Sequence, residues 1–226
     1  MGRDNHPKDR QRQQLERKQN RRASYDRILI VSEGSKTEPN YFDEIRAQYR
    51  LHSANVVVQP SRLGTDCIQV VDYAEALFRD GDAERGIRKR AFEKVYAVFD
   101  RDDHKTFHDA LARAAALNGR LKNDLKQPIR FAAIPSRPSF EFWLLLHFED
   151  VKHLLHRDEA MQRLKKHLPA YEKGTKGTFT RTQPNLGAAI ERARRLLTND
   201  LADDREPYTG IIELVEVLMN LQSPAK

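Results

Sequence analysis

The chain has 226 residues, a formal net charge of +7, and charged side chains at 32% of its positions. This length suits one domain with a substantial core. The single cysteine, Cys67, excludes an intrachain disulfide and a cysteine-rich zinc cluster. No apolar run approaches the roughly 20 residues of a membrane-spanning helix, and the charged N-terminus is unlike a signal peptide. We therefore expect a soluble, cytoplasmic protein.

The basic excess is concentrated at the N-terminus. Between Met1 and Ala23, eight Lys and Arg residues stand against three Asp and Glu, which leaves +5 of the formal +7. This segment is rich in Gln and Asn and has almost no large apolar side chains, so it cannot bury enough surface to fold. We predict a disordered basic arm over residues 1–24, which is either a contact for nucleic-acid phosphates or a solvated tail without a partner.

Short apolar runs alternate with helical patterns in the next part of the chain. Strands are predicted at residues 27–32, 55–59, 94–99 and 130–134. The helices predicted between them lie around residues 39–49, 65–80 and 107–125, and a buried helix follows at 140–148. This alternation predicts an α/β fold with a parallel four-stranded sheet and helices on both faces.

The final third of the chain has a different pattern. Helices are predicted near residues 159–167, 186–197 and 210–221, and the Gly- and Thr-rich segment 173–184 predicts an exposed loop. We expect residues 25–150 to form the α/β domain and residues 151–226 to form a helical appendage packed on it.

Acidic residues follow two of the predicted strands. Glu33 comes directly after the first strand and Asp100 after the third, with Asp102 and Asp103 close behind. Ligands bind outside the carboxyl ends of parallel strands, so these acids should meet at one edge of the sheet. Carboxylates held close together raise each other's pKa, and a hard cation such as Mg²⁺ removes the conflict. The alternative is that the Asp-x-Asp pair only forms a turn or a helix cap.

The segments around these acids resemble a known family. The sequence contains ILIVSEGSKTEPNYF at residues 28–42, VYAVFDRDD at 95–103 and SRPSFEFWLLLHFE at 136–149. A strand ending in Glu-Gly, followed by a strand ending in Asp-x-Asp, resembles the Toprim domain of topoisomerases, primases and OLD-type nucleases. The three segments together resemble the RloB-like family.

The resemblance implies a Toprim (Rossmann-like) fold, dependence on Mg²⁺ or Mn²⁺, and a role in prokaryotic antiviral defence of the abortive-infection type. It implies that Glu33 is a metal ligand or general base and that Asp100 and Asp102 are the metal-binding pair. It also implies a partner ATPase of the ABC/OLD type. The sequence has no GxxxxGK[ST] motif, so a nucleotide-driven step would need another chain.

Three further acids are candidate metal ligands. Asp103 extends the acidic cluster. Glu38 is either a ligand or an acid that stabilises the start of a helix. Glu141 lies in the apolar segment SFEFW, where a carboxylate needs a partner or a metal, and Arg137 is the alternative partner.

Basic residues in the predicted loops are candidates for binding nucleic-acid phosphates, although the same side chains could simply balance charge. They are Lys36, Arg62, Lys105 and Arg137. The sequence therefore predicts a metal-dependent nuclease that cleaves phosphodiester bonds in RNA or DNA. The alternatives are a non-catalytic regulatory subunit of an ATPase complex and a nucleotidyl transferase.

Overall fold

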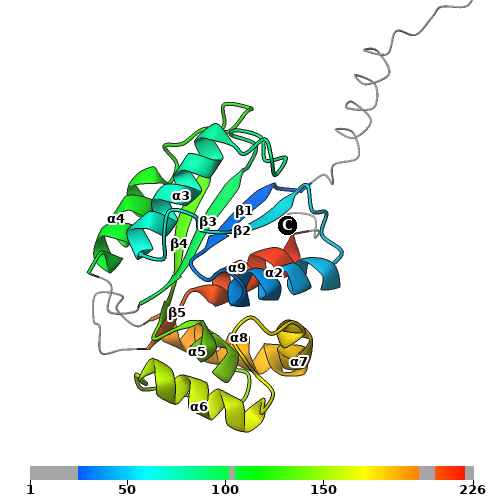
Figure 1. Cartoon of the computed structure of the whole chain (residues 1–226), viewed down its shortest axis with the longest axis vertical. Coiled ribbons are helices and arrows are strands. Elements are labelled where there is room, and N and C mark those ends of the chain that lie inside the picture. Colours follow the sequence, from blue (N-terminus) through cyan, green and yellow to red (C-terminus); the bar gives the residue numbers. More distant parts are fainter. Residues whose placement is uncertain (1–24, 102–104, 199–206, 222–226) are drawn as a thin grey trace, which may run out of the picture.

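A central sheet organises the computed structural model, which describes residues 25–101, 105–198 and 207–221 (Figure 1). Among these residues the sheet has five strands in the order β2-β1-β3-β4-β5. Neighbouring strands from β2 to β4 are parallel, and β5 is antiparallel to β4. The strands are β1 (Ile28–Ser32), β2 (Val56–Pro60), β3 (Lys94–Asp100), β4 (Arg130–Arg137) and β5 (Tyr208–Thr209). The predicted arm at residues 1–24 lies outside the described residues.

The α/β class is confirmed, but the prediction of four parallel strands was incomplete. The fifth strand, β5, pairs with the end of β4 through Thr209 opposite Ser136. A strand of two residues carries no alternating pattern that the sequence could reveal. The strand β4 also extends past the predicted end at residue 134. Pro135 has no N–H to donate, but its carbonyl still accepts a hydrogen bond from Gly210.

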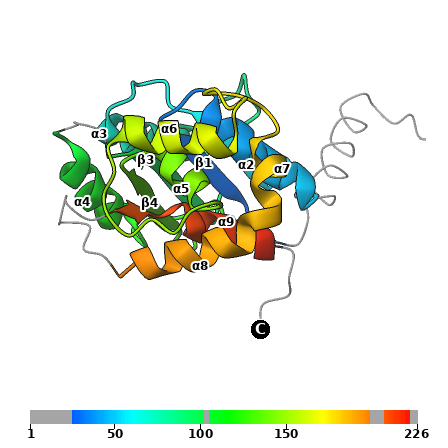
Figure 2. The ribbon, with the colours of Figure 1, turned by 90° about the horizontal axis from the view of Figure 1, so that it is seen from below.

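Helices cover both faces of the sheet. The helices α3 and α4 lie on one face, and α2 and α9 lie on the other, with α5, α6, α7 and α8 beyond the carboxyl end of the sheet (Figures 1 and 2). None of the described helices is long and apolar enough to cross a membrane. Their bounds are α2 (Thr37–Gln48), α3 (Cys67–Asp80), α4 (Phe107–Leu117), α5 (Phe140–Leu145), α6 (Arg157–His167), α7 (Thr178–Thr182), α8 (Leu186–Leu196) and α9 (Ile211–Asn220).

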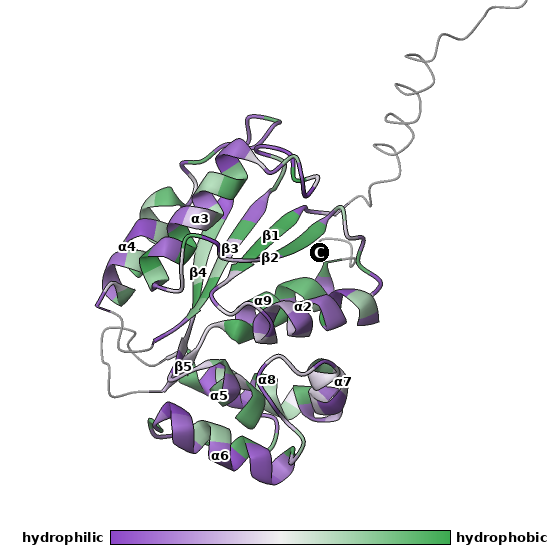
Figure 3. Cartoon of the chain, in the orientation of Figure 1, coloured by the Kyte–Doolittle hydropathy of each residue, from purple (hydrophilic) through white to green (hydrophobic). Residues whose placement is uncertain are grey.

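The core consists of two hydrophobic clusters, one on each face of the sheet. In β1 the side chains of Ile28 and Ile30 belong to the cluster under α2 and α9, and those of Leu29 and Val31 belong to the cluster under α3 and α4. This alternation follows from the two-residue period of a strand. All five residues of β1 are buried, and most of β1 is coloured as hydrophobic in Figure 3. A strand buried on both faces accommodates a charged side chain only near its ends.

The predicted helix at residues 107–125 was too long. Helix α4 ends at Leu117, and Asn118 leaves the helical conformation with ψ at 127°. The side chain of Asn118 then accepts a hydrogen bond of 3.1 Å from the main chain of Phe131, and Gly119 has φ at +71°. The Asn-Gly pair is therefore a turn signal that outweighs the Ala-rich helical pattern before it.

The predicted exposed loop at residues 173–184 was also wrong in part. It contains α7, and a 3-10 helix follows at Gln183–Asn185. The ring of Phe179 is buried and packs edge-to-face on Tyr41, with ring centroids 5.4 Å apart. The hydroxyl of Thr182 donates to the carbonyl of Thr178 at 3.0 Å, so its polar group is satisfied inside the structure. The predicted domain division at residue 150 stays a prediction.

Candidate active site

Glu33 and Asp100 meet at the carboxyl edge of the sheet, as the sequence predicts for acids that follow neighbouring parallel strands. The main-chain N–H of Glu33 donates to the carbonyl of Val98 at 2.8 Å, which carries the β1–β3 pairing one residue past β1. In return, the main-chain N–H of Asp100 donates to Oε2 of Glu33 at 3.0 Å. The sheet therefore fixes both residues side by side.

Glu38 joins these two acids from the first turn of α2. Its carboxylate is buried and lies directly against Gly34, so that a Cβ added at residue 34 would overlap it. The glycine of the Glu-Gly pair is needed here because the carboxylate approaches the main chain closely. Glu38 is thus a buried residue of the cavity, and it also lies in the first turn of α2, so both interpretations of this acid fit its position.

Glu141 enters from the first turn of α5, on the other side of the same edge. It is buried, and its carboxylate accepts hydrogen bonds from Ser139 at 2.8 Å and from the hydroxyl of Tyr171 at 3.1 Å. The ammonium group of Lys173 lies 3.7 Å from Oε1 of Glu141. These contacts hold the carboxylate in one orientation.

The four carboxylates line one cavity of about 220 Å³. Burial, together with repulsion from Glu141 and Glu33, raises the pKa of Glu38 to about 7. Burial also raises the pKa of Asp100 well above its usual range, with added repulsion from the other three acids, and the main-chain N–H of Phe140 opposes the rise. Negative charge in this cavity is therefore costly to the folded protein without a counter-charge.

Two lysines also line the cavity, and one of them was not predicted. Lys36 is exposed in the loop between β1 and α2. Lys173 arrives from a segment that the structure fixes to α2. There Gly174 donates to the hydroxyl of Thr37 at 2.9 Å and accepts from Asn40 at 2.9 Å. No pattern near Lys173 points to the site, because its position depends on this distant contact.

The remaining predicted residues lie in different places. Arg62 and Lys105 are exposed, whereas Arg137 is buried, with its guanidinium 5.9 Å from the ring centroid of Phe107. Asp102 and Asp103 lie outside the described residues. The site assignments, including the nucleic-acid contacts, stay predictions.

The donor chemistry of the cavity suits a hard divalent cation, because its side chains offer carboxylate oxygens and repel one another. Within the described ranges no three His, Cys, Asp or Glu side chains form a ready metal-binding cluster. The fit therefore rests on the four acids Glu33, Glu38, Asp100 and Glu141 and on the raised pKa of two of them. Magnesium binds through one or two carboxylates and keeps several waters, so a full set of protein ligands is not required.

Comparison with known proteins gives one result. The family model for RloB-like proteins matches residues 28–218, which include β1, β3, β4 and every described residue of the candidate site. No curated protein and no solved structure matches the chain.

Proposed function

The chain belongs to the RloB-like family, and from this premise we propose that it is a divalent-metal-dependent nuclease with a Toprim-like fold. The Toprim assignment is supported by the placement of a Glu-Gly pair after β1 and of Asp100 at the end of the neighbouring strand β3. The observation that carries the proposal is the cavity in which four carboxylates from separate elements face two lysines.

The charges of the cavity suit a phosphodiester substrate. A bound Mg²⁺ or Mn²⁺ would neutralise phosphate charge and lower the pKa of a water molecule enough to make it a nucleophile. Lys36 and Lys173 attract the phosphate to the mouth of the cavity, where both side chains are exposed. The buried acids supply oxygens that need no reorganisation when the substrate arrives, because their hydrogen bonds already orient them.

Glu38 and Glu33 have different roles in this proposal. With its pKa raised to about 7, Glu38 can take up or release a proton near neutral pH. Oε2 of Glu33 accepts a hydrogen bond from the main chain of Asp100, which holds the Glu33 carboxylate at the wall of the cavity. We therefore assign Glu33 and Asp100 to holding the cation, together with Asp102, and assign proton transfer to Glu38.

We further propose that the nuclease serves in antiviral defence beside a separate ATPase of the ABC/OLD type. This proposal rests on the family resemblance and on the absence of a GxxxxGK[ST] motif from the sequence. Its test is co-purification from a strain that carries the native gene neighbourhood. Recovery of the chain without any ATPase would contradict the partnership but not the nuclease activity.

The nuclease proposal is tested with the purified chain, alone and with its co-purified partner. Transfer RNA, mixed cellular RNA and plasmid DNA are incubated with Mg²⁺, Mn²⁺ or EDTA. Glu33→Gln and Asp100→Asn should each reduce cleavage on the order of 100-fold or more, since even residues that only support metal ligands cost roughly 10- to 100-fold. The matched controls are Glu159→Gln and Asp158→Asn, which remove the same charges from the exposed side chains of α6.

Two results would contradict the nuclease proposal. Equal cleavage by Glu33→Gln and by the unchanged chain would show that the activity has another source. Absence of cleavage by both the chain and its complex, combined with retained binding of nucleic acid, would favour a non-catalytic subunit.

A further inference from the structure

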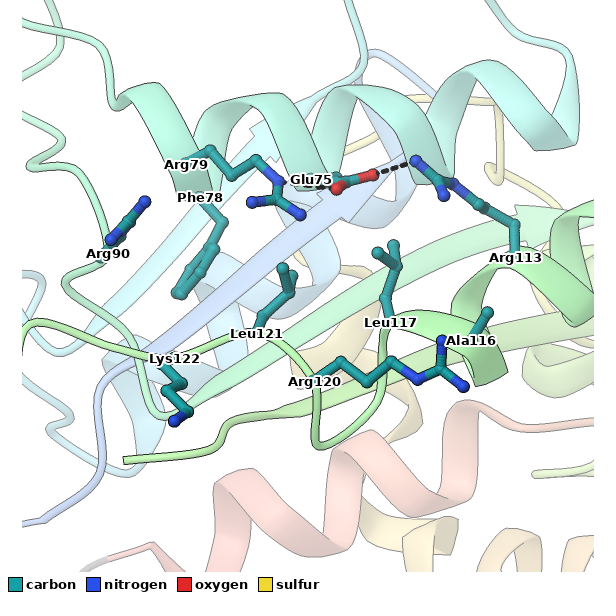
Figure 4. A pocket seen from close by; sticks show the side chains of 10 residues that line it. All are labelled: Glu75, Phe78, Arg79, Arg90, Arg113, Ala116, Leu117, Arg120, Leu121 and Lys122. Atoms are coloured by element: carbon teal, nitrogen blue, oxygen red, sulfur yellow. Dashed lines mark hydrogen bonds and ion pairs between the residues drawn. The ribbon is translucent and has the colours of Figure 1, made fainter. Parts of the chain in front are cut away.

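A second cavity lies at the opposite end of the sheet from the acidic site. It has a volume of about 480 Å³ and lies between the C-terminal half of α3, the end of α4 and the turns that follow α4. The residues that line it are Glu75, Phe78, Arg79, Arg90, Arg113, Ala116, Leu117, Arg120, Leu121 and Lys122. We call it the basic pocket (Figure 4).

One buried carboxylate organises the rim of the basic pocket. Glu75 is only 8% exposed, and its two oxygens are held by different arginines. Nε of Arg79 donates to Oε1 at 2.6 Å, and a terminal nitrogen of Arg113 donates to Oε2. Figure 4 shows Glu75 between these two guanidinium groups. Arg113 also lies 3.6 Å from Asp72, so these two arginines are largely neutralised but fixed in place.

The other three cations give the pocket its excess charge. Arg90, Arg120 and Lys122 are exposed, and none of them forms an ion pair with a described carboxylate. Arg120 and Lys122 come from the turns after α4, and Arg90 comes from the connection before β3. Three cations that have no described carboxylate as a partner, grouped around one cavity, attract a polyanion much more strongly than isolated surface charges do.

The floor of the pocket indicates what kind of anion it takes. It is apolar, but Phe78, Leu117 and Leu121 are each exposed by 5% or less. No aromatic face is therefore open for a base to stack on, and stacking is how most proteins hold single-stranded bases. The exposed groups are guanidinium and ammonium groups, which bind phosphate, and contacts to phosphate do not depend on sequence.

We propose that the basic pocket binds backbone phosphates of a nucleic acid. It thus gives a long substrate a second point of contact, distant from the acidic site. This inference rests on the proposed nuclease function for the identity of the substrate. The strand β3 has seven residues, and at about 3.3 Å per residue it separates the two ends of the sheet by roughly 23 Å. A duplex rises about 3.4 Å per base pair, so only substrates longer than roughly 7 base pairs can reach both places.

The test measures binding by fluorescence anisotropy in EDTA, where cleavage does not interfere. The labelled probes are RNA and DNA duplexes of 6 and 30 base pairs, called the 6-mer and the 30-mer, and a poly-glutamate peptide that matches the charge of the 30-mer. The pocket variant combines Arg120→Gln with Lys122→Gln. The control combines Lys152→Gln with Lys166→Gln, which removes the same charge around α6, a helix that packs on the other hydrophobic cluster.

We expect the pocket variant to bind the 30-mer roughly 10-fold more weakly, and we expect the control to bind it within about twofold of the unchanged chain. Each phosphate contact contributes a slope of about 0.7 to 0.9 to the dependence of log K on log salt. The slope should therefore fall by about 1.5 in the pocket variant. The loss should be larger for the 30-mer than for the 6-mer.

Three outcomes would overturn the inference. Equal losses in the pocket and control variants would mean that only net charge matters. Equal losses for the 30-mer and the 6-mer would show that the pocket does not hold a long substrate that also reaches the acidic site. If the pocket variant loses as much affinity for the poly-glutamate peptide as for the 30-mer, the pocket is a surface for an acidic protein.

The inference and the nuclease proposal fail separately in this design. If nucleic acid is cleaved but the pocket variant binds it as tightly as the unchanged chain does, the nuclease proposal stands and the pocket proposal falls. If the pocket is needed for binding but no substrate is cleaved with Mg²⁺ or Mn²⁺, the pocket proposal stands alone.

Discussion

The main-chain N–H of Asp100 donates a hydrogen bond of 3.0 Å to Oε2 of Glu33. This bond joins the last residue of β3 to the first residue after β1, so the acid on one strand is oriented by the main chain of its neighbour. The side chain of Asp100 is oriented in turn by the main-chain N–H of Phe140. The site thus depends on the parallel pairing of β1 with β3 and on the start of α5.

The crowding of acids predicts that the site destabilises the protein when no cation is bound. Burial and three neighbouring acids raise the pKa of Asp100, so its charge opposes folding at neutral pH. Asp100→Asn keeps an acceptor for Phe140 and removes the charge. We expect it to increase the free energy of unfolding in EDTA by about 0.5–2 kcal/mol, the usual range for one stabilising substitution. Urea unfolding at pH 7.5 measures this change.

The control for this prediction is Asp158→Asn, which removes a carboxylate from the exposed first turn of α6 and should not stabilise the protein. Added Mg²⁺ should stabilise the unchanged chain more than Asp100→Asn. If Asp100→Asn is less stable than the unchanged chain in EDTA, the carboxylate has a structural role that outweighs the repulsion.

The pattern of the sequence was sufficient to predict that Glu33 and Asp100 lie close together and that Glu141 is a candidate for the same site. Glu33 and Asp100 follow apolar runs whose pattern suits buried strands, and parallel strands bring their ends to one edge. Glu141 was identified because a carboxylate in an apolar segment needs partners. Each of these inferences uses residues within one element and a general rule about where the elements meet.

The rest of the site depends on contacts between distant parts of the chain. Tyr171 and Lys173 reach Glu141 because Gly174 forms hydrogen bonds with Thr37 and Asn40. Those two residues precede Gly174 by more than 130 positions in the sequence. The segment is polar and rich in Gly, so its local pattern predicted an exposed loop. The strand β5 was missed for a related reason, since its two residues pair with β4 through tertiary placement alone.

The close approach of Glu38 to Gly34 predicts a severe effect from one added methyl group. In Gly34→Ala the Cβ would overlap the Glu38 carboxylate and force it to move. We expect cleavage to fall at least 10-fold, because displacement of a positioned group by about 1 Å can cost on the order of 100-fold. The measurement is the initial rate of cleavage with Mg²⁺, alongside the midpoint of thermal unfolding.

Gly187→Ala is the matched control for this glycine. An added Cβ at residue 187 meets nothing within 4 Å, and the residue lies inside α8. Ala is favoured over Gly in a helix by about 0.5–1 kcal/mol, so this variant should be slightly more stable and fully active. Unchanged activity in Gly34→Ala would mean that Glu38 has no role in the reaction.

Glu44 fixes the segment that carries Lys173. Its two carboxylate oxygens accept hydrogen bonds from the main-chain N–H groups of Gly177 and Phe179, the latter at 2.8 Å. Glu44→Ala leaves both donors without this acceptor, which should cost about 1–3 kcal/mol of stability. We expect faster amide hydrogen exchange over residues 171–179 and a higher KM for the nucleic acid, because Lys173 is no longer held at the cavity.

Glu159→Ala is the comparison for Glu44→Ala, since Glu159 is an exposed helical glutamate that pairs with Arg163 at 3.4 Å. It should leave the exchange over residues 171–179 unchanged. A higher exchange rate spread over the whole chain in Glu44→Ala, with no local excess, would contradict the specific role of this contact.

His147 predicts how stability depends on pH. It is buried at the end of α5, where Nδ1 lies 3.1 Å from the carbonyl of Trp143 and 3.2 Å from that of Leu144. Burial lowers the pKa of His147 from 6.5 to about 4, although both carbonyls favour the protonated ring. A lowered pKa means that the unfolded chain takes up a proton first as the pH falls through 6.5. The contribution of the neutral ring is therefore complete above pH 6.5 and decreases toward pH 4.

One pKa unit corresponds to about 1.4 kcal/mol, so His147 should cost the protein about 2 kcal/mol of stability between pH 7.5 and pH 5. The acidic site acts in the opposite direction, because the raised pKa of Glu38 favours folding at low pH. The informative quantity is therefore the difference between the unchanged chain and His147→Asn, measured by urea unfolding at both pH values. The variant should lose less stability than the unchanged chain on acidification, whereas His153→Asn, which removes an exposed imidazole, should not differ from it. Equal losses in His147→Asn and the unchanged chain would show that the ring becomes protonated inside the folded protein.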